Sequence, residues 1–445
     1  MRSPVLVFCM LLGACGSCGK DSSEAPDASA SSSPSSSMSS STAVVAEPLP
    51  RCRKGSERLP IQGEEVVVGD VAIGPAGLLV GLTRLNGGKR TASVLRTTLQ
   101  LGEPTFEDVG TPIGDDPPPS PRWNAAKPWV AYFAGRAVDG GTKQRELVVR
   151  TLGEAGTAPH PLRSYQQADE STAFDVAWSE SGTGLVAWDE DGPVVAAEAG
   201  AKPPKPGADP ITRGLVKVQA LADGASPKVI SPDTSDADSP RLVPRAGGGF
   251  WLAWLARKPD EEAQGLEGPG EPRQFRWVEV LPLDAKGESA GPVRKVGSEK
   301  GRAVSFELAR SGADLVVMVQ DEIAASEGAR VVRHRLAETG KPETGDIVKD
   351  GVGHALADLV PSAAAGESAR WLAWSDTNEH THLTQLGPGL VALGKPSSEP
   401  TLEGARVLAS SGDALYGLTG LDGGSGAGTQ NARGAQPELL RFVCP

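Results

Sequence analysis

Apolar and polar positions along the chain form one short pattern that occurs seven times. Each copy is a run of four mostly apolar residues, and in six of the seven copies the third residue is Ala or Gly. The copies are Leu79–Leu82, Trp129–Tyr132, Leu185–Trp188, Trp251–Trp254, Leu315–Met318, Trp371–Trp374 and Leu415–Leu418. Successive copies begin 44 to 66 residues apart, with a mean of 56. This period is typical of sheets arranged around an axis, and the small third residue suits a strand against which the neighbouring sheet packs closely.

The segments around each run alternate between apolar and polar residues, as half-buried antiparallel strands do. Phe174–Trp178 precedes one run, Arg330–Leu336 follows another, and a short fourth strand such as Asp346–Lys349 comes next. Four strands joined by hairpins and repeated seven times predict an all-β fold, a β-propeller of seven four-stranded blades. Six or eight blades are the alternative counts, because the Pro-rich stretch 202–209 obscures the strands of the third copy. A tandem of β-sandwiches is the other alternative.

The last repeat ends one strand short, since Glu438–Val443 gives a third strand and the chain stops soon afterwards. We expect the missing outer strand to come from the N-terminal side, within Leu59–Val68, so that the N- and C-terminal strands close one blade without an open edge. The same closure predicts a disulfide between Cys52 and Cys444, which flank the globular part. Two unpaired thiols are the alternative.

The chain begins with a short apolar run, Pro4–Leu12, which has the length of a signal-peptide core. It ends in Leu12-Gly13-Ala14-Cys15, which resembles the lipobox of bacterial lipoproteins. The resemblance implies that 1–14 is a signal peptide, that Cys15 is lipidated and that the exported protein is anchored to a membrane. The resemblance also implies that Gly16, rather than an Asp, after the cysteine favours the outer membrane if the cell has two membranes. Ordinary secretion with cleavage near Ala14 is the alternative.

A serine-rich stretch separates this signal from the repeats. Ser22–Thr42 contains twelve serines among 21 residues and too few apolar side chains to offset the entropy of ordering. We therefore expect three parts: the signal peptide at 1–14, the lipidated cysteine with a flexible tether at 15–50, and the propeller at 51–445.

Composition narrows the classes of function. The chain carries 56 Asp and Glu against 44 Lys and Arg, a formal charge of −12, and has no basic run. This balance argues against a nucleic-acid partner. The 55 Gly and 37 Pro argue against long helices.

Acidic residues cluster just before several predicted first strands. In a propeller such loops meet on one face around the central channel, where carboxylates would form a negative funnel for a cation such as Ca²⁺. These residues are Asp115, Asp116, Asp169, Asp233, Asp236 and Asp238. Solvated turns capped by Asp are the alternative. The sequence Ser-Pro-Arg occurs in two of these places, at Ser120–Arg122 and Ser239–Arg241.

Other candidate chemistry is sparse, and we expect no cofactor beyond that possible Ca²⁺. His380 and His382 would lie on one face of an extended segment, as a metal pair or, alternatively, in a solvated loop. The nine Trp residues predict packing between blades rather than a sugar-stacking surface. We interpret the chain as a lipid-anchored, non-catalytic module that binds a protein or glycan. An envelope hydrolase or lyase acting at the channel mouth and a purely structural role are the alternatives.

Overall fold

The computed structural model describes residues 52–444 except 114–115, 138–142, 155–159, 166–172, 195–211, 259–274, 300, 325–327, 353–357, 362–368, 377, 379, 403, 421–428 and 431–435. The predicted signal peptide, Cys15 and the serine-rich tether lie outside the described residues. The described helices are the short 3₁₀ turns η1 (Pro388–Leu390) and η2 (Pro400–Leu402). None of the described helices is long and apolar enough to span a membrane.

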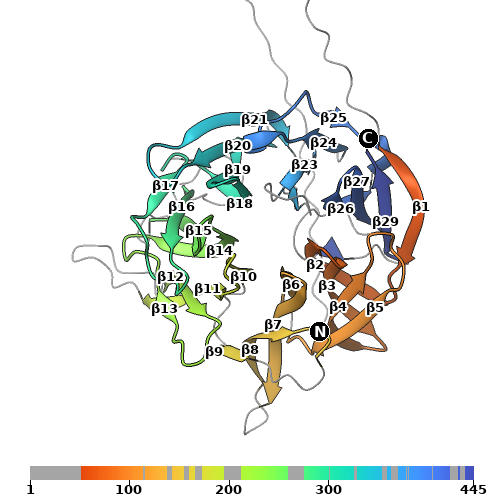
Figure 1. Cartoon of the computed structure of the whole chain (residues 1–445), viewed down its shortest axis with the longest axis horizontal. Coiled ribbons are helices and arrows are strands. Elements are labelled where there is room, and N and C mark those ends of the chain that lie inside the picture. Colours follow the sequence, from red (N-terminus) through yellow and green to blue (C-terminus); the bar gives the residue numbers. More distant parts are fainter. Residues whose placement is uncertain are drawn as a thin grey trace, which may run out of the picture. The chain divides into compact units, whose positions relative to one another are not determined.

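Seven antiparallel sheets form a ring, which confirms the all-β, seven-bladed β-propeller (Figure 1). Blade 1 contains β2 (Glu65–Gly74), β3 (Gly77–Asn86), β4 (Lys89–Thr97) and β5 (Thr105–Gly110). Blade 2 contains β6 (Ser120–Asn124), β7 (Lys127–Ala137), β8 (Lys143–Thr151) and β9 (His160–Tyr165). Blade 3 contains β10 (Phe174–Trp178), β11 (Gly184–Val194), β12 (Thr212–Ala220) and β13 (Lys228–Val229). Blade 4 contains β14 (Asp236–Pro244), β15 (Phe250–Arg257), β16 (Trp277–Leu283) and β17 (Arg294–Val296). Blade 5 contains β18 (Ala303–Ser311), β19 (Asp314–Ala324), β20 (Gly328–Leu336) and β21 (Glu343–Val352). Blade 6 contains β22 (Asp358–Pro361), β23 (Ala369–Ser375), β24 (Thr381–Gln385) and β25 (Ser397–Ser398). Blade 7 contains β26 (Ala405–Ser411), β27 (Ala414–Thr419), β29 (Glu438–Val443) and β1 (Arg53–Pro60), while β28 (Thr429–Gln430) adds a fifth strand beside β2.

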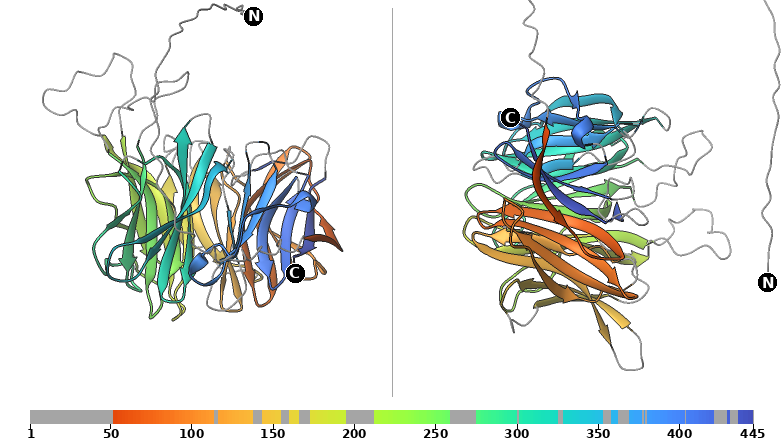
Figure 2. Two further views of the ribbon diagram at one scale, coloured as in Figure 1. Left: turned by 90° about the horizontal axis from the view of Figure 1, so that it is seen from above. Right: turned by 90° about the vertical axis from the view of Figure 1, so that its right-hand side faces the viewer.

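The seven apolar runs are the second strands of the blades, and their small third residue has the predicted steric reason. A Cβ atom added to Gly81 would lie 1.7 Å from the carbonyl oxygen of Pro119, which leads into the next blade. Figure 2 shows the blades from the side, with their strands running along the ring axis. The packing of adjacent blades therefore depends on this small position.

The ring closes through both ends of the propeller. Strand β1 pairs with β29, with Arg53 opposite Val443 and Leu59 opposite Leu439. The disulfide Cys52–Cys444 lies beside this pairing, with the two Cα atoms 4.2 Å apart. The prediction of terminal closure and of the disulfide is confirmed.

The predicted position of the closing strand, Leu59–Val68, is wrong. The outer strand is Arg53–Pro60, and Glu65–Gly74 is instead the innermost strand of blade 1. Five of the first six residues of β1 are polar or charged, because β1 is an exposed outer strand, and this pattern hides it in the sequence. The apolar run Val66–Val68 drew the prediction to β2, which is buried between blades.

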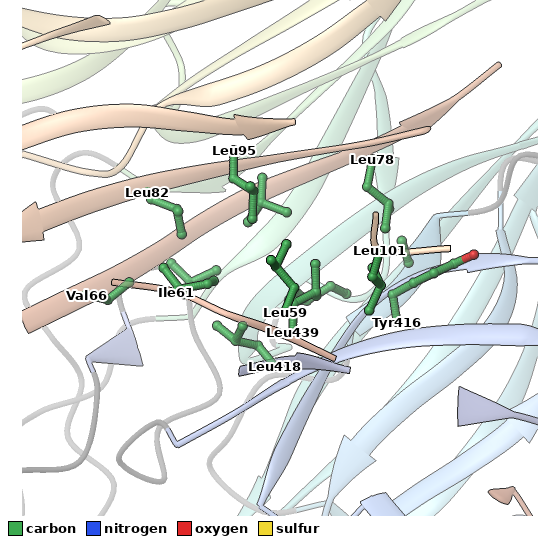
Figure 3. Packing of buried hydrophobic residues seen from close by; sticks show 14 of the residues in the cluster. Leu59, Ile61, Val66, Leu78, Leu82, Leu95, Leu101, Tyr416, Leu418 and Leu439 are labelled. Atoms are coloured by element: carbon green, nitrogen blue, oxygen red, sulfur yellow. The ribbon is translucent and has the colours of Figure 1, made fainter. Parts of the chain in front are cut away.

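The core consists of clusters shared between neighbouring blades. Figure 3 shows the cluster at the seam, where Leu59 and Leu439 of blade 7 pack with Leu78 and Leu95 of blade 1. Tyr416 crosses the same seam, and its hydroxyl donates to the carbonyl oxygen of Leu99 at 2.9 Å. Six of the nine Trp side chains are buried, which confirms their predicted packing role. They are Trp188, Trp251, Trp254, Trp277, Trp371 and Trp374.

Candidate functional site

Each innermost strand contributes one charged residue to a cluster around the ring axis, which we call the axial cluster. Its members, in blade order, are Asp70, Arg122, Asp175, Arg241, Glu307, Asp358 and Arg406. Figure 1 shows their strands β2, β6, β10, β14, β18, β22 and β26 lining the centre of the ring. Acidic and basic residues alternate, but seven positions cannot alternate completely, so Glu307 and Asp358 are neighbours of like charge.

One side of the axial cluster is tightly paired. Arg122 donates to Asp70 at 3.0 Å and to Asp175 at 2.7 Å. The hydroxyl of Ser120 also donates to Asp70, at 2.6 Å. The buried Asp175 accepts, in addition, the backbone N–H of Leu242 in blade 4 at 2.8 Å. These contacts join blades 1 to 4 around the axis.

The electrostatics differ between the two sides of the axial cluster. Desolvation would raise the pKa of Asp70, but Arg122, Arg241 and the Ser120 hydroxyl lower it to about 2. Desolvation raises the pKa of Glu307 to about 7, because Arg241 offsets only part of it and Asp358 adds repulsion. Desolvation also raises the pKa of Asp358, although Arg406 lies 3.6 Å from it and opposes the shift. Glu307 therefore titrates near neutral pH.

The sequence pointed to only part of the axial cluster. The repeated Ser-Pro-Arg motif supplies Arg122 and Arg241, but in the sequence it marks only positions beside the acidic loops. The acids of the cluster were missed, since one charged residue in an alternating strand also fits a solvent-facing position. The signal in the sequence that could have identified the cluster is the recurrence of a charged residue in the first strand of every blade.

The predicted acidic funnel residues have other partners. Asp116 is buried and accepts a hydrogen bond from Arg145 of its own blade at 3.1 Å. Asp236 pairs with Arg257 and accepts the backbone N–H of Gly214 at 2.8 Å. The remaining predicted residues divide as follows: Asp233 is exposed and pairs with Arg213, Asp238 is half-buried in β14, and Asp115 and Asp169 lie outside the described residues.

No three His, Cys, Asp or Glu side chains among the described residues are grouped as metal ligands. The Ca²⁺ site at the acidic loops therefore stays a prediction.

The predicted histidine pair contacts a carboxylate: Asp376 lies 3.0 Å from Nε2 of His382 and 3.4 Å from Nδ1 of His380. Desolvation would raise the pKa of Asp376. Hydrogen bonds from His382 and from the backbone of His380 and Asn378 outweigh this effect and lower the pKa to about 2. His382 also stacks on Trp374, with ring centroids 5.5 Å apart.

A cleft of about 1010 Å³ lies between blades 4 and 5, where its lining extends from β16 and β17 of blade 4 to the start of β18 and to β19, β20 and β21 of blade 5. We call it the blade 4–5 cleft. Its charged lining includes the basic residues Arg276, Lys295, Arg302, Arg330, Lys341 and Lys349 and the acidic residues Asp321, Glu322 and Asp346. This balance is positive, although the whole chain carries −12.

Two groups in the cleft are already engaged. Arg330 donates to Oδ2 of Asp321 at 2.7 Å, and the backbone N–H of Arg302 donates to Oδ1 of the same carboxylate at 2.8 Å. Nδ1 of His334 lies 3.1 Å from the hydroxyl of Thr344. Desolvation lowers the pKa of His334 to about 4, so this imidazole is neutral at physiological pH. Sequence reasoning missed the cleft, because its residues come from two blades that only the ring brings together.

Comparisons with known proteins find similarity at the level of structure. No family model matches the chain, and no curated protein matches it in sequence. The β-propeller domain of the Trilobed protease from Pyrococcus furiosus is 10% identical, with 86% of this chain and 94% of that chain covered and a TM-score of 0.45. A protein of unknown function from Dyadobacter fermentans is 13% identical, with 89% of this chain and 100% of that chain covered and a TM-score of 0.46. An ulvan lyase is 11% identical, with 86% of this chain and 95% of that chain covered and a TM-score of 0.47. Identities of this size carry no activity over to this chain.

Proposed function

We propose that this chain is an exported, lipid-anchored protein of the cell envelope whose propeller binds a protein or glycan ligand without converting it. The lipobox-like Leu12-Gly13-Ala14-Cys15 supports the anchor, and the serine-rich tether that follows supports a body held away from the lipid. In a cell with two membranes, Gly16 favours the outer one.

The observation that carries the binding role is the blade 4–5 cleft. Its volume is in the range of clefts that take small ligands, and the strands of two blades hold its walls. His334 in its wall stays neutral and bonded to Thr344, so it is poorly suited to exchange protons with a substrate near pH 7. A cleft with rigid walls and basic side chains suits recognition rather than turnover.

The test measures ligand binding by the full chain. Saturation-transfer NMR detects which members of a panel of neutral and charged oligosaccharides and peptides bind to it. We expect the ligands that bind to compete with one another and to be recovered chemically unchanged. The variant Asp346→Trp places a bulky side chain on the exposed wall of the cleft and should abolish binding. Asp223→Trp, at an exposed turn in blade 3, is the matched control. Binding that survives Asp346→Trp would contradict the cleft as the site.

The anchor has a separate test. In bacteria that express the full chain, we expect partition into the detergent phase of Triton X-114 and recovery with the membrane fraction. Cys15→Ser should move the protein to the aqueous phase, whereas Cys18→Ser should not. Equal partition of all three proteins would contradict lipidation at Cys15.

One observation favours the alternative of an envelope hydrolase or lyase. Glu307, with its pKa near 7 beside Arg241, has the protonation behaviour of a general acid or base. If the protein degrades a member of the same panel, Glu307→Gln should abolish that activity, whereas Asp346→Trp should leave it unchanged. This pair of variants separates chemistry at the axis from binding in the cleft.

A further inference from the structure

Two arginines lie side by side where blades 4 and 5 meet. Arg276 stands just before β16, and Arg302 stands just before β18. They form a parallel β-bridge in which the backbone N–H of Arg276 donates to Gly301 at 3.0 Å and that of Ala303 donates to Arg276 at 3.2 Å. Residues paired in this way project their side chains on the same side of the ladder. Both side chains are half-buried, and both residues line the blade 4–5 cleft.

This arrangement is unfavourable for the protein alone. Like charges opposite each other in a sheet repel, and neighbouring carboxylates normally offset that repulsion. Within the described part of the chain, neither the Arg276 nor the Arg302 side chain forms an ion pair. The nearby Asp321 carboxylate is held by the Arg330 side chain and by the backbone of Arg302. Both arginines thus line the cleft without an ion-pair partner among the described residues, and basic residues outnumber acidic ones six to three in that lining.

Further positive charge surrounds the pair. Lys341 and Lys349 are exposed lining residues on the blade 5 side, and neither forms an ion pair with another described residue. Because the rest of the chain is acidic, it repels a long polyanion, whereas a ligand small enough to lie inside the cleft meets mainly the local positive field.

This inference rests on the proposed binding function and specifies its ligand. We propose that Arg276 and Arg302 together bind an oxyanion group of a sugar-sized ligand that carries at least two such groups, sulfate, phosphate or carboxylate. A guanidinium presents two parallel N–H donors that match the oxygens of such a group, and two adjacent guanidiniums surround it. Lys341 and Lys349 bind the second anionic group.

The test uses sucrose octasulfate as the probe and sucrose as its uncharged counterpart, with titration calorimetry on the full chain at physiological ionic strength. A trigalacturonate arm distinguishes carboxylate from sulfate recognition. We expect sucrose octasulfate to bind and sucrose not to bind. Arg276→Gln with Arg302→Gln should weaken binding at least about tenfold, since each hydrogen bond to a charged group contributes on this scale. Arg276→Lys with Arg302→Lys keeps the charge and should retain part of the affinity.

The matched control is Arg53→Gln with Arg58→Gln, which removes the same charge from exposed positions on β1 in blade 7, across the ring in Figure 1. We expect this pair to change the affinity by less than about twofold. Equal losses in both double variants, or no loss in either, would overturn the inference. So would tighter binding of a hexaglutamate peptide than of either acidic carbohydrate, which would make the ligand an acidic protein segment.

Failure of this inference can be separated from failure of the proposed function. If Asp346→Trp abolishes binding of a panel ligand while the Arg276 and Arg302 variants do not, the cleft binds a ligand of another chemistry. If neither change affects binding, the cleft is not the site and both proposals fail.

Discussion

Cys52 and Cys444 are bonded to each other across a sequence separation of 392 residues, with their Cα atoms 4.2 Å apart. The bond closes the ring at the blade in which β1, from the beginning of the propeller, completes a sheet of strands from its end. A loop of nearly four hundred residues is therefore fixed covalently at the point where the ring would otherwise open.

Removal of this disulfide should destabilise the propeller. Cys52→Ser with Cys444→Ser frees the ends of a loop of nearly four hundred residues, and the expected loss in the free energy of unfolding is about 2–4 kcal/mol. Denaturant unfolding under non-reducing conditions measures it. An unchanged midpoint would show that the β1–β29 pairing and the seam cluster close the ring without the bond.

Gly81→Ala should destabilise the contact between blades 1 and 2. Because the new Cβ would lie 1.7 Å from the carbonyl oxygen of Pro119, the two blades must move apart, at a cost of about 1–3 kcal/mol or more. Gly345→Ala is the control, since its Cβ would meet only the end of the Arg333 side chain at 3.7 Å. Thermal unfolding of both variants gives the comparison, and similar melting temperatures would contradict the steric argument.

Arg122→Ala should leave Asp70 and the buried Asp175 without their shared cation. Removing one partner of a largely buried ion pair is costly, and we expect a loss of about 2–4 kcal/mol, reduced from the fully buried case because Asp70 is partly exposed. Arg53→Ala, at an exposed position, should change stability by less than about 0.5 kcal/mol. Chemical denaturation of the two variants tests this difference.

Glu307 should make stability depend on pH. Its pKa is about 7 in the folded protein and 4.5 in the reference state, so its contribution is fully present below pH 4.5 and is lost as the pH rises through 7. Wild type should therefore lose on the order of 1–2 kcal/mol relative to Glu307→Gln between pH 4.5 and 8, after allowance for solvent screening. Unfolding curves across this range measure the difference, with Glu103→Gln as the exposed control. Parallel pH profiles for wild type and Glu307→Gln would refute the raised pKa.

The blades could be predicted from the sequence because their second strands are buried on both faces. Such a strand must be a continuous apolar run, and Trp251–Trp254 is apolar at every position for this reason. Strand β1 could not be found in this way, since an outer strand has one face in solvent and its residues resemble a loop. The disulfide was predictable because Cys52 and Cys444 are the only two cysteines in the predicted propeller, 51–445, and they stand at its two ends.

The site was less accessible to sequence reasoning. The acidic residues chosen by position, such as Asp116 and Asp236, are engaged by Arg145 and Arg257 of their own blades. Arg276 and Arg302 are separated by 26 positions in sequence, and no local pattern marks either one. Their relationship arises from the bridge between two blades, which depends on the tertiary packing.

The position of the disulfide also determines how the molecule responds to mechanical load. A pull on the chain ahead of residue 52 reaches the sulfur–sulfur bond before it reaches any hydrogen bond of β1. The outer strand therefore cannot be peeled from β29 from that end while the bond is intact. Tension on a surface-attached form would instead be carried through Cys444 into the sheet of blade 7.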